Sequence, residues 1–181
     1  MKKIFAILAL AVSSTAFAVD YVSVDIDTVK DMSSHVQSTA QYIRAGKEIG
    51  GIQYGLQSRT SVSHASAGGM LNSLELTAGK AFGSFTPFIG VGFDNGLNGA
   101  RGADYQYGLV GATYGAKIGP GFALVGAKTR VNDQSSKINQ TVAFGTYSIP
   151  VAKQVSLNIN LSKSYQDIQE NAYGLGLGFS F

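Results

Sequence analysis

The C-terminal segment, residues 173–181, constrains the fold of this chain more than any other stretch. Apolar residues alternate with Gly and Ser throughout it, and it ends on an aromatic residue. Because successive side chains of a β-strand point to opposite faces, one face of this strand would be wholly apolar. That face would consist of Tyr173, Leu175, Leu177, Phe179 and Phe181. Exposed to water at a sheet edge, such a face promotes aggregation. The segment therefore predicts a strand whose apolar face lies against lipid.

The same alternation recurs along the rest of the chain, between clusters of Gly, Asn, Asp and Ser. In residues 155–162, for example, Val, Leu and Ile alternate with Ser and Asn. No apolar stretch after the N-terminal region reaches the ~20 residues of a membrane-spanning helix. The pattern predicts an all-β fold, with apolar residues outside and polar residues inside a closed antiparallel transmembrane barrel. The strands are expected at residues 20–30, 38–48, 52–63, 71–82, 85–94, 104–118, 121–131, 138–149, 153–163 and 172–181.

The connections between these strands fall into two classes. Tight turns are expected at Gly50-Gly51, Gly83-Ser84, Gly119-Pro120-Gly121 and Pro150-Val151-Ala152. Longer polar loops are expected at residues 31–37, 64–70, 95–103, 132–137 and 164–171. Short turns at one end and longer loops at the other are typical of outer-membrane barrels, as is an even strand count. Ten strands are favoured, but residues 37–48 and 104–118 alternate poorly, so an eight-stranded barrel with one misread hairpin stays open.

A soluble β-sandwich would also alternate, with its apolar faces packed in a core. Two features argue against it. Charged residues are only 14% of the chain, which is low for solvated strand faces. The polar faces carry many small residues and a matched set of charges, as a narrow interior requires.

The N-terminus has the features of a secretory signal. Lys2 and Lys3 precede a short apolar run at residues 4–12, and small residues at Ala16 and Ala18 form an A-x-A cleavage site. The apolar run is too short for a membrane anchor. We expect residues 1–18 to be removed and residues 19–181 to form the barrel. The signal holds two of the 14 basic residues and none of the 11 acidic ones, so the mature chain is nearly neutral, which gives no electrostatic argument for nucleic-acid binding.

Both ends of the chain resemble those of known proteins. Residues 173–181 are similar to the C-terminal assembly signal of outer-membrane barrels, including porins, with Phe181 as the terminal aromatic and Tyr173 and Phe179 upstream. Residues 85–92 resemble a strand of small outer-membrane barrels and porin-superfamily proteins. The resemblance implies a Gram-negative outer-membrane protein that contacts outer-membrane lipid and lipopolysaccharide and engages the barrel-assembly machinery through its last strand. Trimeric general porins are about twice as long, so bulk solute diffusion is not expected.

Charged residues on the polar parity of the strands define the candidate site. We expect seven of them to point into the lumen, where opposite charges can neutralise one another. They are Asp25, Asp27, Arg44, Arg59, Glu75, Lys128 and Arg130. The hypothesis is an ion-pair network centred on the first five, with inward glycines of residues 85–94 and 172–181 leaving room for long Arg and Lys side chains. The alternative is that some of these charges lie at the rims and are solvated.

Enzymatic and metal chemistry find little support. His35 and His64 lie beside serines in expected loops, and Asp31 is available, but no oxyanion donor accompanies them. Two lone histidines without Cys give no metal-ligand spacing, and no cofactor motif occurs. We therefore expect no catalytic residue, metal or cofactor.

Three functions remain at this point. The first is a structural or narrow porin-like barrel with a charged, partly plugged lumen. The second is a surface adhesin or recognition protein that uses loops such as residues 95–103, and the third, ranked last, is a lipid-modifying enzyme. Oligomeric state and any permeant solute stay open.

Overall fold

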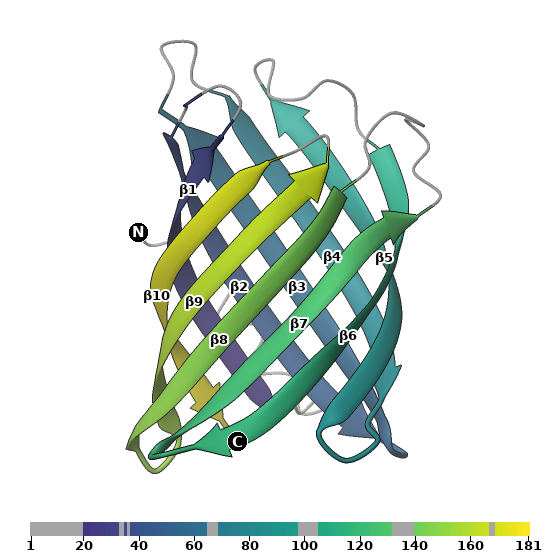
Figure 1. The fold of residues 1–181 in the computed structure, drawn as a ribbon, viewed down its shortest axis with the longest axis vertical. Helices are drawn as coiled ribbons and strands as arrows, with labels where there is room; N and C mark the ends of the chain where they lie inside the picture. The colour runs from purple at the N-terminus through teal and green to yellow at the C-terminus, as the bar shows by residue number, and fades with distance from the viewer. Residues whose placement is uncertain are drawn as a thin grey trace.

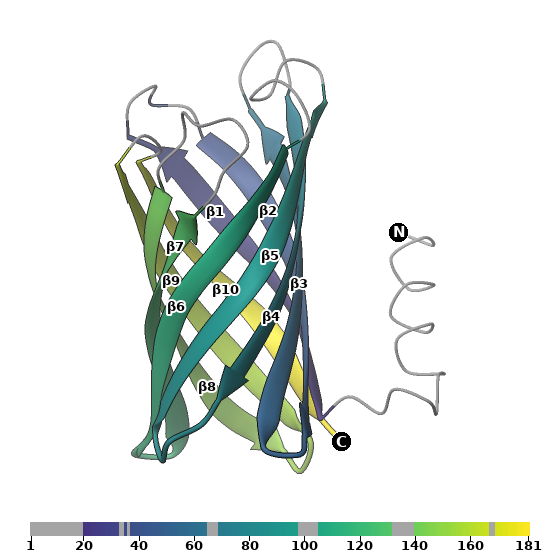
Figure 2. The same cartoon turned by 90° about the vertical axis from the view of Figure 1, so that its right-hand side faces the viewer.

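The computed structural model describes residues 20–32, 35, 37–64, 69–97, 105–131, 140–166 and 169–181. These form ten antiparallel strands that close into one barrel (Figures 1 and 2). The expected closed ten-stranded barrel is confirmed, and the eight-stranded alternative is wrong. The strands are β1 (Tyr21–Asp31), β2 (Gln37–Ile49), β3 (Ile52–Ser63), β4 (Met70–Lys80), β5 (Phe85–Leu97), β6 (Tyr105–Ile118), β7 (Gly121–Val131), β8 (Gln140–Ala152), β9 (Val155–Gln166) and β10 (Glu170–Ser180). Within the described residues, no helix has the length and hydrophobicity needed to cross a membrane. The expected signal, residues 1–18, lies outside them.

Pairing of the first and last strands closes the barrel. Their register runs from Tyr21 opposite Ser180 to Asp31 opposite Glu170. Phe181 adds a backbone hydrogen bond to the Asp20 carbonyl at 3.1 Å. Each described strand thus has a partner on both sides, so no edge is left with unpaired backbone groups, as a spanning sheet requires.

Four short turns join the strands at the end of the barrel where Phe181 lies (Figure 2). Gly50 and Gly51 adopt φ of 60° and 78°, the left-handed region that favours glycine. The turn expected at residues 150–152 is wrong. β8 continues through Pro150 with a register irregularity and ends at Ala152, and the turn falls at Lys153 and Gln154. A bulge accommodates Pro150 because proline cannot donate to the ladder.

At the opposite end, several strands extend further than the sequence suggested. β5 reaches Leu97, β9 reaches Gln166, and β10 begins at Glu170. The connection expected at residues 164–171 is therefore much shorter, and Glu170 belongs to a strand. This extension adds one charged residue, Glu170, to the lumen wall.

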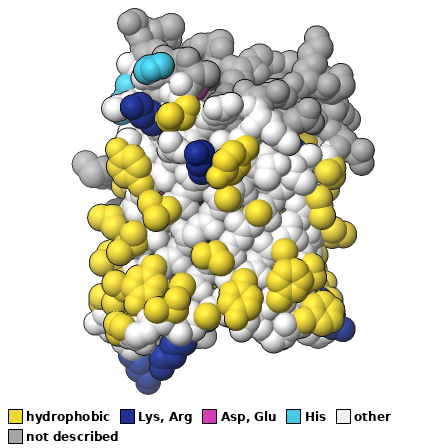
Figure 3. Space-filling model, in the orientation of Figure 1, with side chains coloured by type: hydrophobic (Ala, Val, Ile, Leu, Met, Phe, Trp, Pro, Cys, Tyr) yellow, Lys and Arg dark blue, Asp and Glu magenta, His cyan; other side chains and the backbone are white. Residues whose placement is uncertain are grey.

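The outer face of the barrel is apolar. Large side chains on the outward parity are widely exposed, with Ile89 68% and Leu161 63% accessible. Figure 3 shows hydrophobic side chains over the wall, with Lys and Arg side chains towards the loop end and at the turn end. Apolar outside and polar inside is the arrangement of a transmembrane β-barrel.

Candidate functional site

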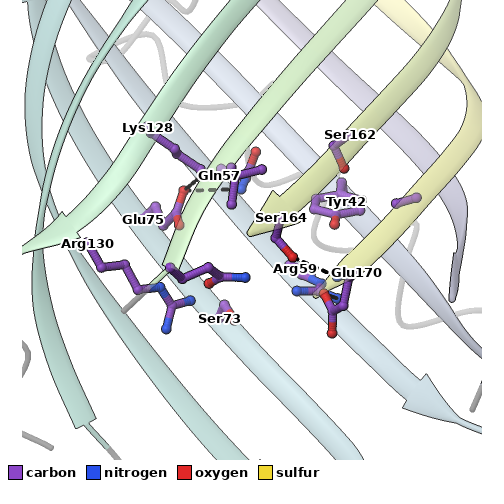
Figure 4. Close-up of a pocket in the computed structure, with 13 residues that line it drawn as sticks. Tyr42, Gln57, Arg59, Ser73, Glu75, Lys128, Arg130, Ser162, Ser164 and Glu170 are labelled. Carbon is purple, nitrogen blue, oxygen red and sulfur yellow. Dashed lines mark hydrogen bonds and ion pairs between the residues drawn. The ribbon is translucent and has the colours of Figure 1, made fainter. Parts of the chain in front are cut away.

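All seven charged residues expected in the lumen lie on the inward parity of their strands, and most line its cavities. Figure 4 shows Arg59, Glu75, Lys128 and Arg130 around the loop-end cavity. Asp25, Asp27 and Glu75 are buried. Each basic residue forms an ion pair with an acid of another strand. The site is therefore a set of buried, paired charges.

Asp25 of β1 is the most completely enclosed of these charges, with 0% exposure. Arg44 of β2 pairs with its Oδ2, which also accepts from Ser23 Oγ at 2.9 Å. Its Oδ1 accepts from the side-chain amides of Asn160 at 2.9 Å and Asn158 at 3.4 Å. Four donors thus offset the cost of burying this carboxylate.

Gln57 of β3 links this cluster to a second carboxylate. It accepts from Arg44 Nε at 2.9 Å and donates to Glu75 Oε2 at 3.2 Å. The same Glu75 oxygen pairs with Lys128 of β7, across the lumen from β3 and β4. A polar layer of Arg44, Gln57, Glu75 and Lys128 therefore crosses the barrel.

Tyr107 of β6 connects Glu75 to a third ion pair. Its hydroxyl lies 3.2 Å from Glu75 Oε1 and 3.1 Å from Asp94 Oδ1, and its single proton can serve one carboxylate at a time. Arg130 pairs with Asp94 at 3.0 Å and stacks on the Tyr107 ring, with its guanidinium carbon 3.9 Å from the ring centroid. The network therefore reaches the part of the wall formed by β5 to β7.

Arg59 belongs to a separate pair nearer the loops. It donates to Glu170 of β10 at 3.4 Å. Tyr42 lies between Arg59 and Arg44, whose guanidinium carbons are 5.8 Å and 4.5 Å from the Tyr42 ring centroid. Asp27 Oδ1 has no hydrogen-bond partner within the described part of the chain.

Of the five charges expected at the centre of the network, Arg44 and Asp25 pair with each other on neighbouring strands, whereas Arg59 and Glu75 pair with acids or bases outside the five. Arg59 pairs with Glu170 and Glu75 with Lys128, each on a strand that is not adjacent. Sequence reasoning missed Asp94, Glu170, Tyr42 and Tyr107. Asp94 could have been found, because it continues the inward parity of Thr86, Phe88, Gly90 and Gly92.

The polar layer divides the lumen into two cavities. Towards the turn end lies a cavity of about 1170 Å³, and towards the loops one of about 70 Å³. Gln57, Glu75 and Lys128 line both cavities and so stand at the boundary between them. The lumen is hollow on one side of this layer and almost filled on the other.

Glycines on one strand make room for side chains of the next. A Cβ at Gly111 would lie 2.5 Å from Phe88 Cζ, and one at Gly126 would lie 2.7 Å from Phe144 Cζ. Gly92 is covered in the same way by the Tyr107 ring. Gly174 and Gly176 face the carboxylates of Asp27 and Asp25. The side chains that lie directly over these five glycines are Asp, Tyr and Phe, and no Arg or Lys side chain is among them.

Tyr21 is accommodated in the same way. Its ring lies over Gly46 and lines the turn-end cavity. Tyr173 and Phe181 remain exposed, at 56% and 63%, and Phe179 is half-buried.

The two histidines lie near the loops. His64 Nε2 is 3.0 Å from Thr39 Oγ1, and its backbone N donates to Gln37. Ser33 and Ser34, the expected neighbours of His35, lie outside the described residues, as does most of the 95–103 loop. Across the described ranges, no three metal-ligating side chains cluster.

Comparisons with known proteins identify the fold. No protein-family model and no curated protein matches the chain. The β domain of the Bordetella autotransporter BrkA is similar in structure, with TM-score 0.52 and 8% identity over 89% of this chain and 98% of that one. Neisserial surface protein A gives TM-score 0.46 and 14% identity over 89% and 96%. The translocator domain of the Neisseria meningitidis autotransporter NalP gives 0.46 and 9% over 99% and 94%. At these identities the likeness concerns fold alone, and the fold is that of the small bacterial outer-membrane β-barrels.

Proposed function

We propose that this chain is an integral outer-membrane β-barrel whose lumen is closed by the polar layer, so that it passes ions weakly or not at all. The observation that carries the proposal is the layer of Arg44, Gln57, Glu75 and Lys128 between the two cavities. Paired charges held by hydrogen bonds resist displacement, because separating one partner leaves an uncompensated buried charge. A solute would have to break these contacts to pass.

The surroundings of the barrel form part of the same proposal. The apolar outer face suits contact with outer-membrane lipid and lipopolysaccharide, and the exposed apolar residues of β10 suit recognition by the barrel-assembly machinery. Export through a cleaved signal at residues 1–18 would deliver the chain to the periplasm. The same proposal gives the barrel a non-enzymatic role, with His64 as a hydrogen-bond partner of Thr39 near the loops.

Planar-bilayer conductance tests the closed lumen. Wild-type protein is expected to give no stable current steps. The Glu75→Ala/Lys128→Ala variant removes both members of one pair, leaves neither charge orphaned, and is expected to give stable steps. Ser73→Ala is the matched control, because Ser73 lines the loop-end cavity without a partner in the layer.

Heat-modifiable migration in gel electrophoresis would verify that each variant is folded. Stable steps from the wild type would show an open pore and refute the proposal. A folded but silent double variant would show that the lumen is closed elsewhere.

A further inference from the structure

The turn-end cavity is large enough to hold a small molecule. Its 1170 Å³ exceed the roughly 300–1,000 Å³ of most small-molecule sites. It reaches the turn end, where Ser84 and Pro120 line it, and it stops at Glu75 and Lys128. A molecule could enter from the turn end and would meet a closed end.

One wall of this cavity is apolar. Phe88 of β5, Phe122 and Leu124 of β7, and Val142 and Phe144 of β8 point inward and line it. Phe122 is 47% exposed, although it faces the lumen. Water against such a wall is unfavourable, and covering it gains about 25 cal/mol per Å². An apolar ligand that covers this wall would therefore gain free energy by removing it from water.

The opposite wall is polar, and its side chains are already satisfied. Asn158 and Asn160 bind Asp25, and Ser156 binds Asn158. A ligand would therefore gain most by laying an apolar chain along β5, β7 and β8 and leaving the other wall to water.

Lys117 stands at the mouth of the apolar wall. It lies opposite Phe122 in the β6–β7 register, lines the cavity and is exposed. Among the described residues it has no ion pair. Asp20 and Glu48, the acids at the same end, belong to the β1–β2 side, across the ring of strands from β6, where Asp20 accepts from the Glu48 backbone N–H at 2.7 Å. The mouth thus offers a cation on the apolar side.

We propose that this cavity binds a single-chain fatty carboxylate. The tail lies along Phe122, Leu124 and Phe144, and the carboxylate stays at the wet mouth beside Lys117. A tail-first orientation follows from the shape, because the closed end lies beyond the apolar wall and the mouth is solvated. The orientation rests on the proposed closure of the lumen at Glu75 and Lys128, whereas binding along the apolar wall does not depend on it.

Solution NMR of the methyl-labelled protein in deuterated lipid nanodiscs tests it, with octanoate as the probe. Nuclear Overhauser contacts from octanoate are expected at the methyl groups of Leu124 and Val142, which face the lumen. Leu175 and Leu177 face outward and report octanoate dissolved in lipid. Octylammonium, with the same tail and the opposite charge, is expected to bind more weakly.

Two substitutions test where the carboxylate and the alkyl chain of octanoate bind. Lys117→Gln is expected to weaken octanoate binding about two- to fivefold, the scale of one exposed ion pair. Lys153→Gln, in the β8–β9 turn and outside the cavity lining, is the matched control and is expected to leave binding unchanged. Leu124→Gln is expected to weaken binding about tenfold by making the wall polar.

Contacts only at Leu175 and Leu177 would overturn the proposal, because the probe would then reside in lipid alone. Octylammonium binding as tight as octanoate, or equal effects of Lys117→Gln and Lys153→Gln, would overturn the role of Lys117. A conducting wild-type barrel would refute the closed lumen and leave the lumen-methyl contacts as a separate result.

Discussion

The substitution Gly176→Ala tests how the buried charge of Asp25 is accommodated. Gly176 lies opposite Asp25 in the β1–β10 register, and the carboxylate occupies the space that a side chain would fill. A Cβ there would lie 2.6 Å from Asp25 Cγ and 2.6 Å from the Val24 carbonyl oxygen. The carboxylate therefore has to move, and the Val24 backbone, which is held in the ladder, has to give way as well.

The expected cost follows from the bonds that this movement breaks. Asp25 Oδ1, the oxygen nearest Gly176, accepts from Asn158 and Asn160, whereas Arg44 and Ser23 bind Oδ2. Hydrogen bonds to a charged group contribute about 1.5–3 kcal/mol each, so losing two costs about 3 kcal/mol at the lower value. Replacing glycine by alanine recovers about 0.4–1 kcal/mol from the unfolded state. Gly176→Ala should therefore lower the free energy of unfolding by at least about 2 kcal/mol, because strain at the Val24 backbone adds to the lost hydrogen bonds.

Gly145→Ala is the matched control. A Cβ at Gly145 would meet Leu124 O and Val125 Cγ1 at 3.7 Å each, which is ordinary contact. This variant should be stabilised by about 0.4–1 kcal/mol. Urea unfolding in phospholipid vesicles, followed by tyrosine fluorescence and gel mobility, measures both. Equal stabilities of the two variants would refute the idea that glycine at 176 is needed to house the Asp25 carboxylate.

Two further predictions concern the Tyr107 hydroxyl and the Arg59–Glu170 ion pair. Tyr107→Phe keeps the ring but removes the proton shared by Glu75 and Asp94, and should lower the free energy of unfolding by about 1–3 kcal/mol in the same urea assay; an unchanged value would contradict the bridging role. Glu170→Gln leaves the Arg59 guanidinium without its counter-charge, and a double-mutant cycle with Arg59→Gln should give a coupling of about 1 kcal/mol or more; zero coupling would show that the pair is solvated.

Strand parity could be predicted from sequence, and with it the direction in which charges point. In residues 22–27 the alternation places Asp25 and Asp27 on one face, and they do lie on one face of β1. The residues at which strands begin and end were harder to predict from the sequence. The sequence places Glu170 in a loop, because the apolar alternation begins only at Ala172, whereas in the structure the ladder with β1 continues to the pair of Asp31 and Glu170.

The partners of the charges could not be predicted. Arg59 of β3 meets Glu170 of β10, and Lys128 of β7 meets Glu75 of β4. These contacts depend on the tilt and stagger of the closed barrel, which fix the height of each inward residue and are not encoded in any local pattern. The inward direction of Tyr107 could not be predicted for a different reason. Glycines at 108, 111 and 115 fall on both parities of β6 and obscure its alternation.

The placement of glycine explains how one lumen can be hollow and plugged at once. In the turn-end half, Phe88 and Phe144 lie against Gly111 and Gly126, so their rings stay at the wall and the centre remains empty. Nearer the loops, the inward positions of β3 and β7 carry Arg59 and Arg130, whose side chains reach into the bore to meet acids. A ten-stranded barrel is slightly wider than side chains alone can fill, so filling depends on which inward positions are long and which are glycine. The closed layer and the apolar cavity are therefore two consequences of one inward pattern. A change at Gly111 or Gly126, which are covered by phenylalanine rings, should alter the cavity without displacing the ion pairs above it.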